Sequence, residues 1–525
     1  MGFWQQVASF KLNEMNLSLS NLQKIAAHGA IAAPTDAQLL LPEKVLQFGT
    51  GVLLRGLPDF VINKANEQGR FNGRIVVVKS TATGDATAFE TQDCLYTVCI
   101  RGIAAGMKKE ENHLISSISR VLSAATDWEE VLLCAANPAL QIVVSNTTEL
   151  GITLIKDNVH ATPPVSYPGK LLAFLYQRYK LFNGDAASGL VIIPTELIPD
   201  NADKLLSILL ELAHQNGLEI PFIEWLENAN HFCNSLVDRI VPGRFNQSEQ
   251  ASVQEQLGYE DELMIMCEEY ALWAIQTDNE EVKGILSFAD ADDTTVVAPD
   301  ISKFRELKLR LLNGSHTFSC SLAWLAGFTT VKEAMGESTF HSYISRLMHE
   351  AIIPAIESEQ LPTLEAKKFA AAVLDRYSNP YVDHLWANIC VQSSSKMVTR
   401  NLDLLEAYAS RFGDASPLMS LGLAAHILYM KTTPAADGKY YGSWQGERYL
   451  VTDQHAAAYN QAWQSVEDST AVNIILKNEA LWGTDLSNLP GLVTSINKWL
   501  ALLQEKGAAA SMQKVLEEKH LVNEK

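Results

Sequence analysis

Residues 44–60 read KVLQFGTGVLLRGLPDF, and this stretch decides the fold. Its first five residues form the apolar run of a buried strand, and the residues after the glycines favour a helix. In a strand-to-helix turn of this kind, one glycine permits the tight turn and a second lets the backbone approach a pyrophosphate at the helix N-terminus. The spacing therefore predicts a dinucleotide site that includes Gly49, Thr50 and Gly51.

The match to the dinucleotide fingerprint is incomplete. Leu54 stands where a third glycine is expected, and the second strand ends in Lys79 instead of the acidic residue that usually binds the NAD ribose. A phosphate-binding loop for ATP is disfavoured, because Leu57 and Pro58 follow Gly56 where Lys and Ser or Thr are needed. A plain strand-to-helix turn without a ligand remains the alternative.

The segments after this turn extend the pattern to a whole domain. Continuous apolar runs at 74–79, 140–145 and 189–194 alternate with helical-period segments such as 58–67 and 170–182. Such strands are typical of a parallel sheet that is covered by helices on both faces. We therefore predict an α/β, Rossmann-like N-terminal domain with a mostly parallel sheet over residues 41–295, preceded by an appendage at 1–40.

The second half of the chain has a different pattern of apolar residues. Its helical-period segments are 304–312, 340–356, 364–377, 402–412, 418–430 and 492–505. They predict a mainly α-helical C-terminal domain over residues 296–525. The acidic, Thr-containing stretch 290–299 has the composition of a loop and is the predicted linker.

Composition excludes several classes of function. The 525 residues carry 41 basic and 61 acidic side chains, a net charge of −20 that opposes attraction to nucleic acid or anionic lipid. No stretch approaches the roughly 18–20 apolar residues of a membrane-spanning helix, and the first residues do not resemble a signal peptide. The 7 cysteines and 12 histidines lack the spacing of a zinc site. We expect a cytoplasmic protein with reduced cysteines, no metal, and no nucleic-acid or membrane partner; its oligomeric state is left open.

A second informative stretch, FRELKLRLLNGSHTFSC at 304–320, sets three polar groups in an apolar helical run. At about 100° per residue, Lys308, Asn313 and His316 share one broad face, although Lys308 and His316 would lie about 12 Å apart along an unbroken helix. A break at 314–315 would change this spacing. A lysine can act as general base on a hydroxyl, while an amide and an imidazole can hydrogen-bond the oxygen as charge develops. The cluster suits hydride transfer at a carbinol carbon; the alternative is a solvated stripe with one satisfied histidine.

With these residues in place, the sequence resembles the uronate branch of the mannitol dehydrogenase family of long-chain polyol dehydrogenases. The family's K-x4-N-x2-H signature matches the Lys, Asn and His just named, and its G-x-G-x3-R turn matches Gly49, Gly51 and Arg55. Further segments that resemble this branch are SNTTE (145–149), VSYP (165–168), NSLVDRIVPG (234–243), LGY (257–259) and RYSNPYV (376–382).

The resemblance implies a reaction and roles for the three residues. It implies reduction of the ketone of tagaturonate to altronate by NADH, without a metal, in a cleft between the two domains. Lys308 would be the acid/base, Asn313 a donor to the carbonyl oxygen, and His316 a substrate-orienting group. A fructuronate reductase, a mannitol-type polyol dehydrogenase and a non-catalytic dinucleotide-binding protein remain alternatives.

Further contacts are expected around these groups. The expected cofactor contacts are Arg55, Lys79, Asn146, Thr147 and Glu149. Lys79 could favour NADP, but the resemblance to the uronate branch implies NAD.

The expected substrate contacts are Asp238, Arg376, Arg310 and Asn201. The family's second oxyanion asparagine matches Leu197, so Asn201 or the backbone of Glu196 replaces it, or the uronate branch relies on Asn313 alone. If Asn201 does not replace it, Asn201 is a structural turn residue. Arg376 and Arg310 are candidates to hold the carboxylate of a sugar acid in bidentate fashion, or else they are structural ion-pair partners.

Overall fold

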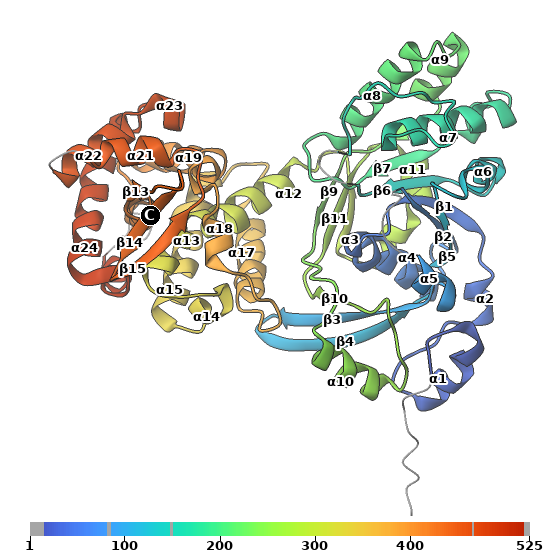
Figure 1. The fold of residues 1–525 in the computed structure, drawn as a ribbon, viewed down its shortest axis with the longest axis horizontal. Coiled ribbons are helices and arrows are strands. Elements are labelled where there is room, and N and C mark those ends of the chain that lie inside the picture. The colour runs from blue at the N-terminus through green and yellow to red at the C-terminus, as the bar shows by residue number, and fades with distance from the viewer. Residues whose placement is uncertain (1–14, 81–85, 148–150, 465–466, 519–525) are drawn as a thin grey trace, which may run out of the picture. The chain divides into compact units, whose positions relative to one another are not determined.

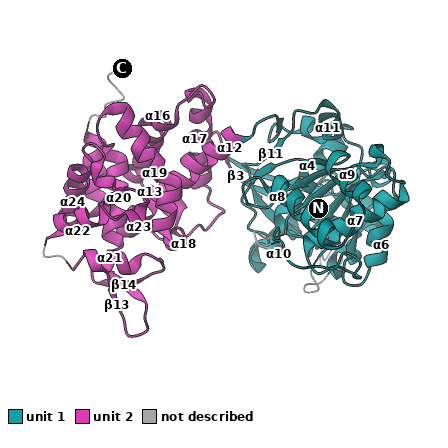
Figure 2. Cartoon of the chain, turned by 90° about the horizontal axis from the view of Figure 1, so that it is seen from above, with its two compact units in different colours: residues 1–101, 108–301 teal, residues 102–107, 302–525 magenta. Residues whose placement is uncertain are grey.

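The computed structural model of the chain describes residues 15–80, 86–147, 151–464 and 467–518. The chain divides into two compact units (Figure 2): Met1–Arg101 with Lys108–Ile301, and Gly102–Met107 with Ser302–Lys525. The boundary therefore falls after Ile301. The stretch 290–299 is not the loop that its composition indicated, because Thr295–Ala298 forms strand β12, which pairs in parallel with β11 (Leu272–Gln276).

The centre of the first unit is a sheet of six parallel strands in the order β5-β2-β1-β6-β7-β8 (Figure 1). Its strands are β1 (Glu43–Phe48), β2 (Arg74–Lys79), β5 (Ile118–Ser123), β6 (Ile142–Ser145), β7 (Val191–Pro194) and β8 (His231–Phe232). This is the order of a doubly wound dinucleotide-binding sheet, whose direction of progression reverses between β1 and β6. The predicted Rossmann-like fold class is confirmed.

The continuous apolar runs exist because both faces of this sheet are buried. In β2, Ile75 and Val77 join one core cluster, whereas Val76 and Val78 join another. Helices α3 (Val52–Gly56), α4 (Pro58–Glu67) and α11 (Glu280–Ile285) contribute to the first cluster. Helices α6 (Trp128–Leu133), α7 (Tyr167–Leu181), α8 (Asn201–Gln215) and α9 (Ile220–Asn228) contribute to the second.

Two small sheets and the N-terminal segment complete the first unit. One sheet contains β3 (Tyr96–Ala104), β4 (Met107–Ile115) and β10 (Ile265–Glu268); the other contains β9 (Ser235–Asp238), β11 and β12. The remaining α-helices of the first unit are α1 (Leu22–His28), α2 (Asp36–Leu39), α5 (Thr87–Thr91) and α10 (Gln247–Leu257). Leu17, Leu22 and Ile25 are buried in a cluster with Tyr259, so the described part of 1–40 belongs to the core of this unit.

The second unit is mainly helical, as predicted. Its helices are α12 (Ser302–Leu307), α13 (Ser315–Leu325), α14 (Val331–Met335), α15 (Ser338–Arg346), α16 (Ile353–Ile356), α17 (Thr363–Tyr377), α18 (Trp386–Cys390), α19 (Ser393–Phe412), α20 (Pro417–Tyr429), α21 (Ala456–Ala462), α22 (Asp468–Leu476), α23 (Glu479–Trp482) and α24 (Leu492–Glu517). Two π-helices, Lys308–Gly314 and Leu347–Ile352, interrupt this series. A three-stranded antiparallel sheet, β13 (Thr432–Pro434), β14 (Tyr440–Trp444) and β15 (Glu447–Val451), lies beyond α20 in the sequence.

Helices α13 and α20 form the centre of the second unit. Nearly all residues of both are buried, and they contribute to one large apolar cluster with α24. Over the residues that the structure describes, no helix is long and apolar enough to cross a membrane.

Candidate active site

The predicted nucleotide turn follows β1 directly. Gly49 has φ +128°, and a Cβ there would lie 2.9 Å from the carbonyl oxygen of Asn146, so glycine is required at this position. Gly51 is the N-cap of α3, and a Cβ built there would meet no atom within 4 Å. Thr50 between them is half-exposed. The turn is thus packed against the sheet on one side and open on the other, which fits a bound pyrophosphate.

The carboxyl ends of β6 and β7 are linked by side chains beside this turn. The Asn146 amide donates to the carbonyl and the hydroxyl oxygens of Thr195, each at 3.0 Å. The buried Glu196 carboxylate accepts from the Thr147 N–H at 2.9 Å and from its hydroxyl at 3.0 Å. Burial raises the pKa of Glu196. Asn146 and Thr147 therefore hold the ends of β6 and β7 together, one strand from the β1–β6 pair where the sheet order reverses. Glu149 lies outside the described residues.

Arg55 and Lys79 both follow the turn in the sequence. The Arg55 guanidinium donates to the carbonyl oxygen of Leu263 at 2.6 Å and lies 5.5 Å from the ring centroid of Tyr96. Burial lowers the pKa of Arg55. These contacts anchor Arg55 within the unit, and its role as a cofactor contact stays a prediction. Lys79 ends β2 as the sequence indicated and is 9% exposed.

Asn201 is fully buried at the start of α8. Its Nδ2 donates to the carbonyl oxygens of Pro194, Glu196 and Ser235 at 2.9–3.1 Å, and its Oδ1 accepts from the Ser235 N–H at 3.0 Å. Both amide hydrogens are used in these contacts, which favour the structural role among the alternatives that the sequence left open.

Two other positions of the first unit were expected to lie near the substrate. Leu197, at the matched oxyanion position, is 56% exposed and offers no side-chain donor. Asp238 is buried at the end of β9, where its role as a substrate contact stays a prediction.

Lys308 and Asn313 lie in the π-helix Lys308–Gly314, which joins α12 to α13. A π-helix forms hydrogen bonds between residues five apart, so it turns by less than 100° per residue. Asn313 follows Lys308 by five residues and is therefore about one turn away, closer to the same side than α-helical geometry predicts. Gly314 and Ser315 keep helical φ and ψ angles, so no break occurs there.

His316, in the first turn of α13, is 8% exposed and firmly positioned. Its ring stacks on Tyr377 with centroids 4.0 Å apart, and it meets the edges of His384 and Trp386 at 5.2 and 5.8 Å. Its Nε2 atom has no hydrogen-bond partner among the described residues. Burial and nearby basic groups, His384 and Arg400 first among them, hold the pKa of His316 well below its ordinary value. His316 is therefore a neutral imidazole with one nitrogen available to a ligand.

Basic side chains surround this imidazole. Arg376, in the last turn of α17, is 8% exposed, and Lys396 and Arg400 of α19 are half-buried. All three lower the pKa of His316 by their charge. Arg310 instead donates to Glu306 at 3.0 Å, to Asp403 at 2.5 Å and to the Arg400 carbonyl oxygen at 2.8 Å, which makes it a structural ion-pair partner.

His384, Lys396 and Arg400 were not among the residues predicted from the sequence. One signal was present: Lys396 and Arg400 are four residues apart near the start of a helical segment. Like charges at this spacing in a helix repel each other. Two basic residues placed against this repulsion indicate a local need for positive charge.

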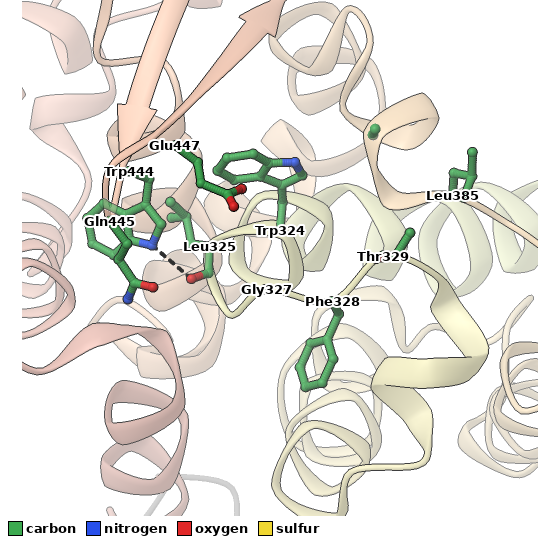
Figure 3. Close-up of a pocket in the computed structure, with 10 residues that line it drawn as sticks. Trp324, Leu325, Gly327, Phe328, Thr329, Leu385, Trp444, Gln445 and Glu447 are labelled. Atoms are coloured by element: carbon green, nitrogen blue, oxygen red, sulfur yellow. Dashed lines mark hydrogen bonds between the residues drawn. The ribbon is translucent and has the colours of Figure 1, made fainter.

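A pocket of the helical unit contains none of the predicted site residues (Figure 3). It has a volume of about 410 Å³ and is lined by Trp324, Leu325, Gly327, Phe328, Thr329, Leu385, Ala387, Trp444, Gln445 and Glu447. Glu447 is the only ionisable residue in that lining, and its charge would repel a sugar acid. Over the described residues, no group of three or more His, Cys, Asp or Glu is arranged to hold a metal ion.

Comparison with known proteins gives the family of the chain. Family models of the mannitol dehydrogenase Rossmann domain and the mannitol dehydrogenase C-terminal domain match residues 43–285 and 300–504. The chain is 37% identical to an altronate oxidoreductase of Halalkalibacterium halodurans, over 91% of this chain and 94% of that protein. It is 35% identical to an altronate oxidoreductase of Bacillus subtilis, over 91% and 95%.

Solved structures agree at the level of the fold. The ternary complex of Pseudomonas fluorescens mannitol 2-dehydrogenase with NAD and D-mannitol covers 96% of this chain and 100% of its own, with a TM-score of 0.66 and 21% identity. A D-sorbitol dehydrogenase in substrate-free form covers 95% and 100%, with a TM-score of 0.73 and 18% identity. From the two matched domains and the extent of these similarities, the chain belongs to the mannitol dehydrogenase family.

Proposed function

We propose that the chain is an NAD-dependent dehydrogenase that reduces the ketone of tagaturonate to the hydroxyl of altronate, in a reversible reaction. The observation that carries the proposal is the buried, neutral His316, which follows the π-helix with Lys308 and Asn313 and is surrounded by basic side chains. This arrangement offers proton transfer and oxygen binding next to positive charge, which is what a keto acid needs. The similarity to proteins named altronate oxidoreductase supports this substrate.

The residues of the first unit fit a nicotinamide dinucleotide. When bound, NADH would supply the hydride for the carbonyl carbon. Gly49, Thr50 and Gly51 would hold its pyrophosphate on the open side of the turn. Lys79 leaves the choice between NADH and NADPH undecided, and we propose NAD because the related mannitol 2-dehydrogenase was solved with it.

Three residues of the second unit would have separate roles in binding the substrate oxygen and moving its proton. Negative charge grows on the substrate oxygen as its carbon is reduced, and the Asn313 amide would donate a hydrogen bond to that oxygen. The Lys308 ammonium would then give the oxygen its proton, and in the reverse direction the amine would take this proton back. The available Nε2 of His316 would orient the substrate through one more hydrogen bond. Because His316 is neutral, it adds no charge that would compete with Lys308.

The test is the loss of reduced-nicotinamide absorbance with purified protein. NADH and NADPH are each combined with tagaturonate, fructuronate or fructose in parallel wells. We expect rapid oxidation of NADH with tagaturonate and little with fructose. Preferred use of fructuronate or fructose would reject the substrate, whereas no oxidation in any well would reject the activity.

A further inference from the structure

The first two turns of α19 carry two cations whose hydrogen-bond acceptors are uncharged. The Arg400 guanidinium donates to the Thr317 hydroxyl at 3.2 Å, and the Lys396 ammonium donates to the carbonyl oxygen of Ile389 at 2.9 Å. Among the residues that the structure describes, neither forms an ion pair with a carboxylate. Both side chains are half-buried.

This arrangement is unfavourable in the protein alone. Burial and, for Lys396, the charge of Arg400 lower the pKa of each group. Partly buried cations are normally paired, because burial removes their hydration. The chain has 61 acidic residues and 41 basic ones, so carboxylates that could pair with these two cations are abundant in the sequence. Arg310, which lies close to Arg400 in the fold, does have its own two carboxylates, Glu306 and Asp403.

Two hydrogen bonds connect Arg400 to the proposed catalytic turn. The Thr317 hydroxyl that accepts from Arg400 donates in turn to the Asn313 carbonyl oxygen at 2.8 Å. His316, next to Thr317, has the buried Nε2 atom without a partner. Arg310 holds the Arg400 backbone at its carbonyl oxygen. Arg400 therefore lies beside the residues proposed to bind the substrate. Thr317 holds its side chain, and Arg310 holds its backbone.

We propose that Arg400 binds the carboxylate of the sugar acid and so makes the enzyme select a uronate over a neutral polyol or ketose. This inference rests on the proposed function. A guanidinium has five N–H donors, and the described contacts of Arg400 use one of them. The remaining donors can bind a carboxylate in bidentate fashion, with Lys396 nearby adding to the positive charge.

The decisive variant is Arg400→Met, which keeps the bulk of the stem and removes the charge. We expect KM for tagaturonate to rise about 100-fold, since a charge-assisted bidentate pair is lost. We expect kcat to change less, and the NADH dissociation constant to stay the same. The preference for tagaturonate over fructose should fall by a similar factor, and Arg400→Lys should restore part of it. The matched control is Arg411→Met, an exposed position of the same helix that is paired with Glu357.

A measurement on the wild type covers the case in which R400M does not fold. The uncharged methyl ester of tagaturonate should have a kcat/KM about 100-fold below that of the acid, since it removes the same pair from the substrate side. If the wild type uses tagaturonate but neither R400M nor the ester alters KM, the role of Arg400 is rejected and the proposed function stands. If the wild type prefers fructuronate and R400M raises that KM, Arg400 keeps its role and only the named substrate fails. A wild type that uses only neutral sugars would reject both.

Discussion

Replacing Asn201 by Ala tests whether this residue supports the fold or takes part in catalysis. The amide makes four hydrogen bonds that connect the residues after β7, the start of α8 and β9. Each buried hydrogen bond contributes about 1 kcal/mol net, and the truncation leaves carbonyl groups without a donor, so we expect a loss of about 3–5 kcal/mol. For a unit of this size that corresponds to a melting temperature lower by roughly 10 °C.

The assay combines thermal unfolding with steady-state kinetics below the new melting temperature. If Asn201 is structural, N201A should keep KM and most of kcat while its melting temperature falls. The control is Asn228→Ala, at an exposed asparagine whose amide makes a single bond to the Glu224 carbonyl oxygen; we expect it to change the melting temperature by little. A variant with an unchanged melting temperature and a kcat reduced by 100-fold or more would refute the reasoning, because it would show that Asn201 supplies the second oxyanion donor after all.

Three further predictions concern the turn, the acid/base and a buried histidine. Lys308→Ala should lower kcat by about 10²–10⁴-fold, the range for a lost general acid, while a fluorescence titration gives the same NADH affinity. Gly49→Ala should destabilise the first unit by about 1–3 kcal/mol in urea unfolding and weaken NADH binding, because its Cβ would meet a backbone oxygen at 2.9 Å; Gly69→Ala, with positive φ and open space, measures the conformational cost alone. Burial lowers the pKa of His426 to about 4, so the folded state resists a proton that the unfolded chain takes up near pH 6.5. Stability from this group is present above pH 6.5 and is lost as the pH falls, so the difference in unfolding free energy between wild type and His426→Gln should shrink by about 2 kcal/mol from pH 7 to pH 5. Only that difference isolates the histidine, because Asp59, whose pKa burial raises to about 7, titrates in the opposite sense.

The sequence predicted the elements whose pattern comes from burial alone. The strands at 74–79 and 189–194 are apolar throughout because helices cover both faces of the sheet. β4 was missed because its face is largely exposed and its sequence, MKKEENHLI, is mostly polar. β12 was taken for a linker because its stretch is acidic and rich in Thr, whereas its strand forms through pairing with β11. Pairing of this kind depends on the tertiary structure and leaves little trace in the local sequence.

The candidate site, like the fold, could be predicted from the sequence only in part. Lys308, Asn313 and His316 were visible because polar groups are conspicuous in an apolar helix. Their alignment was not, because a π-helix differs from an α-helix by its hydrogen bonds and has no simple residue pattern. Arg310 and Arg400 could not be ranked from the sequence, because both are basic residues in helical segments.

Arg310 and Arg400 differ in the charges that surround them, and this difference shows how an acidic protein could bind the proposed acidic substrate. Arg310 has two carboxylates within ion-pair distance and contributes little net charge. Among the described residues Arg400 has no carboxylate within ion-pair distance, and it keeps its charge beside His316. A net charge of −20 acts over long distances that salt screens, whereas a partly buried cation acts at a few ångströms with little screening. A local excess of positive charge can therefore bind a carboxylate even though the chain as a whole is negative, and raising the ionic strength should weaken binding of a sugar acid less than a purely surface attraction would predict.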